Sequence, residues 1–216
     1  MIKQFTFNHF AENTFLLIDE KTRECAIIDP GTKSDLEAKE LFLFTEECKL
    51  KVTHILLTHP HIDHFCGVEK VCKHYNLPLT MHKEGLEVLS SFEQLADSMG
   101  FEAVNAKDLQ KNFVEYNTTI ILGEYTIKTL DASGHAPGSI AYYVEKENAV
   151  FVGDAVFNSS IGRTDLFGGD LELLLSNIRK NILSLPLDTE IYPGHGPKTD
   201  VDYEAANNPY INNLDF

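Results

Sequence analysis

The chain has few cysteines and no disulfide-type spacing among them. Its 216 residues contain four cysteines, Cys25, Cys48, Cys66 and Cys72, and no two of them form a CxxC pair. We therefore expect reduced thiols rather than a disulfide framework. Cys66 follows His64 by two residues, and we interpret it as a small packed residue on the inner face of a helix.

Basic residues are also scarce. The 18 Lys and Arg face 33 Asp and Glu, so the net charge is −15 and the sequence pI is about 4.9. Nucleic-acid binding needs a basic footprint, so this balance argues against RNA or DNA partners and favours small-molecule substrates.

No targeting segment is evident at the start of the chain. Residues 1–10 mix Lys3, Gln4, Asn8 and His9 with apolar residues, as a strand does. We expect a cytoplasmic protein without a membrane partner. With 43% hydrophobic residues the chain can build a substantial core, and its length predicts a single domain over residues 1–216.

Metal-binding side chains are concentrated in one short segment. Thr58-His59-Pro60-His61-Ile62-Asp63-His64 holds three imidazoles and a carboxylate within six residues, a density that core packing rarely produces. His59 and His61 leave the same side of an extended chain, so both can reach one ion. Asp63 is placed to cap a helix that follows, at the carboxyl end of a strand, where α/β sheets usually bind ligands.

Three later segments each place a candidate ligand beside a glycine, close to a strand. The segment 133–139 surrounds His135 with glycines and a proline, and Asp154 ends an apolar strand at Gly153. His195 lies between two glycines directly after a strand-like run over 190–192. Turn residues of this kind let the backbone approach an ion closely.

The rest of the chain alternates strands with helices. We expect strands near 5–7, 14–18, 24–29, 54–58, 119–122, 125–130, 139–144 and 150–152. Ser34-Asp35-Leu36-Glu37 has the form of a capping box and predicts a helix to about Cys48. Asp170 is expected to cap a second helix, whose apolar stripe ends before Pro186.

Residues 83–113 contain none of the candidate ligands and are predicted to be largely helical. We favour an outer layer that packs Leu86, Leu89, Phe92 and Leu95 inward, and a lid over the site is the alternative. Within this segment Met99 and Phe101 are weak candidates for substrate contact.

The ordered ligand pattern resembles the metallo-β-lactamase superfamily, whose signature H-x-H-x-D-H is followed by a lone His, a Gly-Asp and a Gly-His. All of these elements are present in that order along essentially the whole chain. The resemblance implies a four-layer αββα sandwich with the metal site at one edge of the sheets. The residue pattern itself predicts only a mixed α/β fold with a substantial sheet.

The resemblance also implies two metal ions. His59, His61 and His135 would bind one ion, Asp63, His64 and His195 would bind the other, and Asp154 would bridge them. Imidazole and carboxylate ligands accept zinc, iron and manganese, and we expect zinc first. In such a site a bridging hydroxide attacks an acyl carbon, with Asp63 or Asp154 handling protons, so no serine or cysteine nucleophile is needed.

Within the superfamily, the segments Ser160–Asp165, Gly194–Thr199 and Asn208–Tyr210 look like those of short glyoxalase II-like thioesterases. We therefore predict hydrolysis of S-lactoylglutathione or a related small thioester. True β-lactamases generally lack the bridging aspartate. Full-length glyoxalase II has a further C-terminal helical domain that binds glutathione, and none is expected here.

Substrate-contacting residues are harder to identify. Lys198 is a weak candidate for binding a substrate carboxylate. Arg163 is another, although a pair with Asp165 is the favoured interpretation. His9, His54, His74 and His82 lie outside the signature. Of these, His54 is expected to serve a structural or supporting role.

Two alternatives remain open. A mononuclear iron persulfide dioxygenase has the same fold and most of the ligand positions, but tends to differ around the last histidine, where this chain keeps Gly194-His195-Gly196. A purely structural metal is the second alternative. Structural zinc usually occupies a closed site of four ligands, whereas seven ligands for two ions leave room for water.

Overall fold

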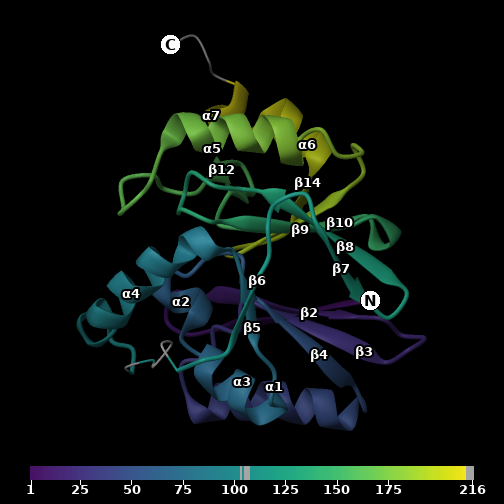
Figure 1. The fold of residues 1–216 in the computed structure, drawn as a ribbon. Coiled ribbons are helices and arrows are strands. Elements are labelled where there is room, and N and C mark those ends of the chain that lie inside the picture. Colours follow the sequence, from purple (N-terminus) through teal and green to yellow (C-terminus); the bar gives the residue numbers. More distant parts are fainter. Residues whose placement is uncertain (103, 105–107, 213–216) are drawn as a thin grey trace.

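The computed structural model describes residues 1–212 except 103 and 105–107, and it shows two six-stranded sheets packed between helices (Figure 1). The first sheet has the order β1-β2-β3-β4-β5-β6. Its strands are β1 (Ile2–Phe7), β2 (Glu12–Ile18), β3 (Glu24–Ile28), β4 (Lys51–Leu56), β5 (Leu79–Met81) and β6 (Lys111–Phe113).

The second sheet has the order β14-β13-β10-β9-β8-β7. Its strands are β7 (Thr119–Leu122), β8 (Tyr125–Asp131), β9 (Ile140–Val144), β10 (Ala149–Gly153), β13 (Glu190–Pro193) and β14 (Thr199–Asp200). A separate hairpin joins β11 (Val156–Phe157) to β12 (Ser160–Ile161). The predicted strands are thus confirmed, and the sequence did not predict the short strands β5, β6, β11, β12 and β14.

The helices lie outside the sheets, as Figure 1 shows. On the side of the first sheet are α1 (Asp35–Glu47), α2 (Ile62–Phe65), α3 (Val68–Tyr75), η1 (Lys83–Gly85), α4 (Leu86–Leu95) and η2 (Asp97–Met99). Covering the second sheet are α5 (Leu171–Asn177), its π-helical continuation η4 (Ile178–Ile182), α6 (Val201–Asn207) and α7 (Pro209–Asn212), while η3 (Glu145–Glu147) is a turn between strands.

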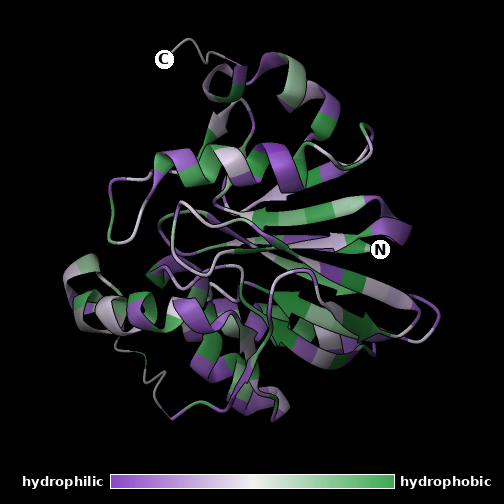
Figure 2. Cartoon of the chain, turned by 45° about the horizontal axis from the view of Figure 1, so that its top comes forward, coloured by the Kyte–Doolittle hydropathy of each residue, from purple (hydrophilic) through white to green (hydrophobic). Residues whose placement is uncertain are grey.

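Three hydrophobic cores hold the four layers together. Along β2, Leu16 and Ile18 pack toward the helices of the first layer, whereas Phe15 and Leu17 pack between the sheets. The period of two in a strand sends alternate side chains to opposite faces, so β2 is buried on both. A third core joins the second sheet to α5. The αββα sandwich is therefore confirmed, and Figure 2 shows its apolar strands between helices of mixed polarity.

The helix caps predicted for α1 and α5 are both present. The Ser34 side chain accepts a hydrogen bond from Glu37 N, and the Glu37 carboxylate accepts one from Ser34 N, which completes the capping box of α1. Asp170 accepts a hydrogen bond from Leu173 N at the start of α5.

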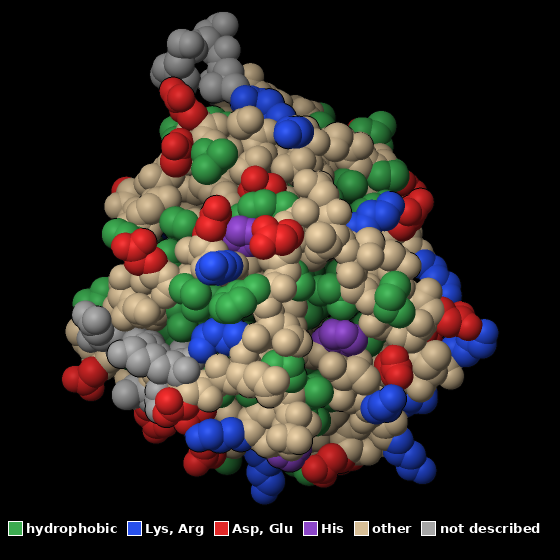
Figure 3. Space-filling model, viewed as in Figure 1, with side chains coloured by type: hydrophobic (Ala, Val, Ile, Leu, Met, Phe, Trp, Pro, Cys, Tyr) green, Lys and Arg blue, Asp and Glu red, His purple; other side chains and the backbone are tan. Residues whose placement is uncertain are grey.

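Charged side chains of both signs are interspersed over the face of the molecule in Figure 3. Within the described part of the chain, every helix is too short or too polar to cross a membrane.

The segment 83–113 only partly matches its prediction. Leu89 and Phe92 are buried in the first core and Leu86 packs against it, as expected. Leu95 instead is 49% exposed, because α4 ends there and its last residue turns outward. Residues 103 and 105–107 of this segment lie outside the described residues.

Candidate metal centre

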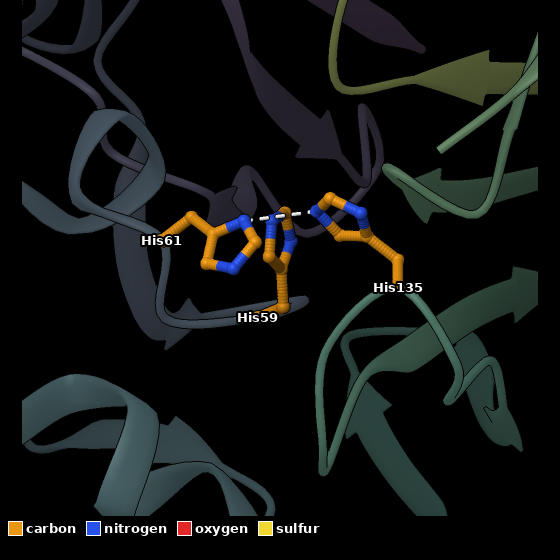
Figure 4. Close-up of side chains that lie close together, drawn as sticks. All are labelled: His59, His61 and His135. Carbon is orange, nitrogen blue, oxygen red and sulfur yellow. Dashed lines mark hydrogen bonds between the residues drawn. The ribbon is translucent and has the colours of Figure 1, made fainter. Parts of the chain in front are cut away.

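The first candidate ligand group contains His59, His61 and His135. His59 and His61 follow β4, and His135 lies in the loop between β8 and β9. One ring nitrogen from each residue lies within 4.8 Å of the other two, and Nε2 of His135 is 2.9 Å from Nδ1 of His61. Figure 4 shows the three rings converging from the two loops. They can surround one ion.

The second candidate ligand group contains Asp63, His64 and His195, whose ligand atoms also lie within 4.8 Å of one another. Asp63 Oδ2 is 3.1 Å from His195 Nε2 and 3.8 Å from His64 Nε2. The prediction that Asp63 caps the helix is wrong. His61 is the N-cap of α2, without a side-chain cap, and the Asp63 carboxylate faces the two histidines instead.

Asp154 lies between the two groups, just after β10. Its Oδ2 is 3.6 Å from His135 Nε2 on one side and 3.6 Å from His195 Nε2 on the other. Its Oδ1 is 3.3 Å from His64 Nε2. One carboxylate therefore reaches both groups, which is the geometry a bridging ligand needs.

The first group holds its imidazoles in the form that binds metals. Burial lowers the pKa of His61 to about 3, with a further contribution from His135. Burial likewise lowers the pKa of His59 and of His135. All three rings are thus neutral at pH 7, and a neutral imidazole can donate its lone pair to an ion.

The carboxylates of the site are ionised. Burial is the largest influence and would raise the pKa of Asp63 and of Asp154, but the neighbouring histidines, His64 first among them, together outweigh burial and lower the pKa of both. In return Asp154 and Asp63 raise the pKa of His64 against the effect of burial. The protein thus presents charged oxygen donors beside nitrogen donors.

Several buried atoms of the centre have no hydrogen-bond partner among the residues that the structure describes. They are Nε2 of His59, His61 and His64, and Oδ1 of Asp154. Buried polar atoms normally have hydrogen-bond partners. Four unpaired atoms close together, all able to act as metal ligands, therefore fit a site that binds ions. Imidazole and carboxylate ligands suit zinc, iron or manganese. The residues present therefore fit two divalent cations.

Hydrogen bonds to backbone carbonyls orient two of the rings. Nδ1 of His135 lies 2.7 Å from the carbonyl oxygen of Arg163, and Nδ1 of His195 lies 3.1 Å from that of Phe10. A carbonyl only accepts, so each Nδ1 carries the proton and each Nε2 is left free to face the centre.

Glycines let the strands approach the ligands. A Cβ on Gly194 would lie 2.3 Å from Asp154 Oδ1 and 2.5 Å from His64 Cε1. A Cβ on Gly153, whose φ is +53°, would lie 2.4 Å from Thr58 Oγ1. The glycines that precede Asp154 and His195 are therefore required by space, as the sequence pattern indicated.

Asp29 is a supporting residue that the sequence analysis missed. Its Oδ1 accepts from Thr58 N at 2.6 Å, and its Oδ2 accepts from Thr58 Oγ1 at 2.6 Å and lies 3.0 Å from His64 Nδ1. The signal was available. Asp29 ends a strand that pairs in parallel with β4, so both carboxyl ends meet at one edge.

Glu12 is a second buried carboxylate near the centre, and no sequence signal marked it. It is fully buried, accepts from Thr14 Oγ1 at 2.9 Å, and has one oxygen 4.0 Å from His64 Nδ1. Burial raises its pKa well above the ordinary value.

A cavity of about 550 Å³ opens over both ligand groups. His61, His135, Asp63, Asp154 and His195 lie in its wall. The other described lining residues are Phe10, Phe92, Met99, Phe157, Ser160, Ile161, Arg163 and Leu166. The segment 83–113 thus contributes to the site through Phe92 and Met99, whereas Phe101 packs behind Phe10.

The two weak candidates for substrate binding differ in position. Arg163 lines the cavity, and its guanidinium forms two bonds of 2.7 Å with the Asp165 carboxylate, so the expected pair is confirmed. Lys198 instead contacts Glu190 and does not belong to the described cavity lining.

The histidines outside the signature have structural contacts. Nδ1 of His54 lies 2.9 Å from Oγ1 of Thr53 within β4. This contact is structural and does not involve a candidate ligand. His74 stacks on Phe42 and His82 stacks on Tyr116. His9 packs on Phe10 and Phe101. Among the residues that the structure describes, none of the four joins a metal-capable group.

Comparison with known proteins identifies the family. The model of the metallo-beta-lactamase superfamily matches residues 9–195. The chain belongs to this superfamily. A relative from Bacillus subtilis (strain 168), the probable metallo-hydrolase YqgX, is 36% identical over 93% of this chain and 92% of its own length. The hydroxyacylglutathione hydrolase GloC of Haemophilus influenzae is 32% identical over 94% of each chain.

Solved structures of the superfamily agree with the fold. The BLEG-1 B3 metallo-beta-lactamase is 32% identical, superimposes with a TM-score of 0.89, and is matched over 98% of this chain and 100% of its own. TTHA1623 in a di-iron-bound form is 31% identical with a TM-score of 0.85, over 96% of this chain and 99% of its own. This superfamily member is accordingly a metal-dependent hydrolase that binds divalent metal.

Proposed function

We propose that this superfamily member is a thioester hydrolase of glyoxalase II type, which acts on S-lactoylglutathione or a related small thioester. One observation carries the proposal: two ligand groups share Asp154 and open together on one cavity. The likeness to a relative named hydroxyacylglutathione hydrolase supports the reaction class.

We propose His59, His61 and His135 as ligands of one ion, Asp63, His64 and His195 as ligands of the other, and Asp154 as ligand of both. When bound, two divalent ions lower the pKa of a shared water toward about 7 and polarise an acyl carbonyl. Zinc is the first expectation, and iron is supported by the likeness to a di-iron-bound structure.

The chain's own residues supply proton transfer and shelter. Asp63 and Asp154 line the cavity as carboxylates, so they can accept a proton from an attacking water as well as bind. The apolar rings of Phe92 and Phe157 border the same space and exclude bulk water from the reacting carbonyl. Cysteine is not required as nucleophile, since burial raises the pKa of Cys66, the thiol next to α2, well above its ordinary value.

The test is release of free thiol from S-lactoylglutathione by purified protein whose metal content has been measured. Rapid release at two metals per chain is the expected result. No release from a fully loaded sample would reject this substrate. Oxygen uptake with glutathione persulfide on a sample holding one iron would instead establish the dioxygenase alternative.

Asp154→Ala tests the shared carboxylate. We expect metal content to fall below two per chain and thiol release to drop by at least about 10³-fold, since both ligand groups lose a donor. Metal analysis and a thiol assay on the same samples measure both effects. Asp202→Ala is the matched control, because Asp202 is an exposed aspartate on α6. Full activity of Asp154→Ala with one bound metal would contradict the dinuclear proposal.

The likeness to a B3 metallo-beta-lactamase favours β-lactam hydrolysis as a second candidate. Turnover of nitrocefin by the same metal-analysed protein tests it. We expect turnover of the thioester to exceed that of nitrocefin. Faster turnover of nitrocefin than of the thioester would instead favour β-lactam hydrolysis as the function.

A further inference from the structure

We propose that the cavity over the metal centre binds a neutral hydrocarbon arm of the substrate. The inference rests on the proposed thioester hydrolase and narrows its substrate class. Six apolar side chains carry it: Phe10, Phe92, Met99, Phe157, Ile161 and Leu166.

These apolar side chains adjoin the candidate ligands directly. The ring of Phe92 lies 4.7 Å from the ring of His61 in the first group, and the ring of Phe157 lies 6.1 Å from that of His195 in the second. A hydrocarbon chain in contact with either ring is therefore within a few atoms of the metal centre. The apolar wall and the reacting position form one continuous site.

Phe10 is an apolar residue of the cavity wall that remains exposed to solvent. Its side chain is 44% exposed, although it stacks on Phe101 at 5.7 Å and packs on His9 at 4.5 Å. The packing from behind fixes the ring while its front face lines the cavity. Apolar surface held exposed at the wall of a polar site is typical of a ligand-binding surface.

The charges of the cavity do not favour an anionic arm. Arg163 is the one Lys or Arg in the described lining, and its charge is offset by the bidentate bond to Asp165. The chain as a whole carries a net charge of −15, which repels anions at a distance. The described wall therefore offers the carboxylate of an anionic arm no Lys or Arg other than the one already paired with Asp165.

Affinity for a series of neutral thioethers tests the proposal without relying on turnover. The probes are S-methyl-, S-butyl- and S-hexyl-N-acetylcysteamine, with an S-(5-carboxypentyl) analogue whose chain matches hexyl in length but ends in a carboxylate. Calorimetry on metal-loaded protein measures each Kd. A fully buried methylene strengthens binding about fourfold, so partial burial predicts at least about tenfold between methyl and hexyl, with the carboxylate weaker than hexyl.

Variants locate the effect. Phe10→Ser removes an exposed ring and keeps the carbonyl that bonds His195, so the fold and the ligand orientation are preserved. Met99→Ser is a second variant in the same wall. Both should reduce the gain from methyl to hexyl, whereas Phe113→Ser, which removes a ring 46% exposed on β6 outside the cavity, should not.

Each result decides the inference. A Kd independent of chain length, tighter binding of the carboxylate analogue, or a chain-length effect that survives both wall variants would overturn it. Hydrolysis of S-acetyl-N-acetylcysteamine by the same samples reports the proposed reaction separately. If the thioester is hydrolysed but Kd does not depend on the length of the thioether chain, the thioesterase proposal stands and the apolar arm is rejected. If Kd falls with chain length but no thioester is hydrolysed, the apolar arm stands and the thioesterase proposal is rejected.

Discussion

Asp29 connects the first sheet to the candidate metal centre through a single carboxylate. It accepts from the backbone and hydroxyl of Thr58 and contacts His64 Nδ1. Residues of this kind fix the orientation of a ligand ring, and their loss typically lowers metal affinity by about 10- to 100-fold. Asp29 is therefore expected to be a sensitive point of the site, although it is not one of the seven candidate ligands.

Asp29→Asn tests this role. The backbone of Asp29 has a φ of +51°, which asparagine tolerates, so the fold should persist. We expect the affinity for Zn²⁺ to fall by about 10- to 100-fold because an amide cannot accept from both Thr58 and His64. Competition with a fluorescent chelator measures the change.

Asp19→Asn is a matched control, since Asp19 is equally buried and accepts backbone hydrogen bonds at the turn after β2. It should alter stability and leave Zn²⁺ affinity unchanged. An unchanged affinity in Asp29→Asn, or an equal loss in the control, would show that Asp29 does not orient His64.

At the scale of elements, Glu204 on α6 holds the hairpin that borders the cavity. It is fully buried and accepts from Ser159 N at 3.1 Å, Thr199 Oγ1 at 2.7 Å and Asn208 Nδ2 at 2.6 Å. Asn208 in turn donates to the carbonyl oxygen of Ser160. The C-terminal helices thus position β11 and β12, which supply Phe157 and Ile161 to the cavity.

Glu204→Ala should lower the free energy of unfolding by about 3 kcal/mol, because it leaves three donors unpaired in a buried place. Urea unfolding followed by circular dichroism measures the loss. Glu47→Ala, at an exposed position on α1, should change stability by less than about 0.5 kcal/mol. Equal stability of both variants would mean that water replaces the Glu204 carboxylate.

Patterns of neighbouring residues predicted the helices and strands better than they predicted the residues that support the metal ligands, Asp29 and Glu12. The capping box at Ser34 and the strand before His59 depend on neighbouring residues, so sequence sufficed for them. Asp29 and Glu12 acquire their roles only when β3 pairs with β4 and β2 packs beside them. Leu95 was assigned to the core because its helical period fits, but the end of α4 determines its exposure.

The seven candidate ligands were predicted from spacing and order. They follow strands, and three of them, His135, Asp154 and His195, come directly after a glycine. The structure places all seven together. The cavity wall was largely missed, because Phe10, Phe157 and Leu166 come from three separate segments of the chain that only the packed fold brings into one surface.

For the whole molecule, the first hydrophobic core predicts a loss of stability in alkaline solution. Burial raises the pKa of Cys25 and of Cys72 from about 9 to about 12, and that of Tyr75 from about 10 to about 12. The folded state therefore favours the protonated forms more than the unfolded state does. This contribution is complete below about pH 9 and is lost as the pH rises toward 12.

Urea unfolding at pH 8, 10 and 11 checks this expectation, and the midpoint should fall steadily across the series. Cys25→Ala should make the fall less steep, because one of the raised groups is gone. A midpoint that does not change between pH 8 and pH 11 would contradict the assignment.

The seven candidate ligands are divided between the two sheets. His59, His61, Asp63 and His64 follow a strand of the first sheet, whereas His135, Asp154 and His195 follow strands of the second. A nascent chain holds an incomplete set until His195 has been synthesised and the sheets have docked. Ion capture is then a late event in biogenesis, and the cellular supply at that moment selects the metal. The same polypeptide made in different hosts should accordingly carry different ions.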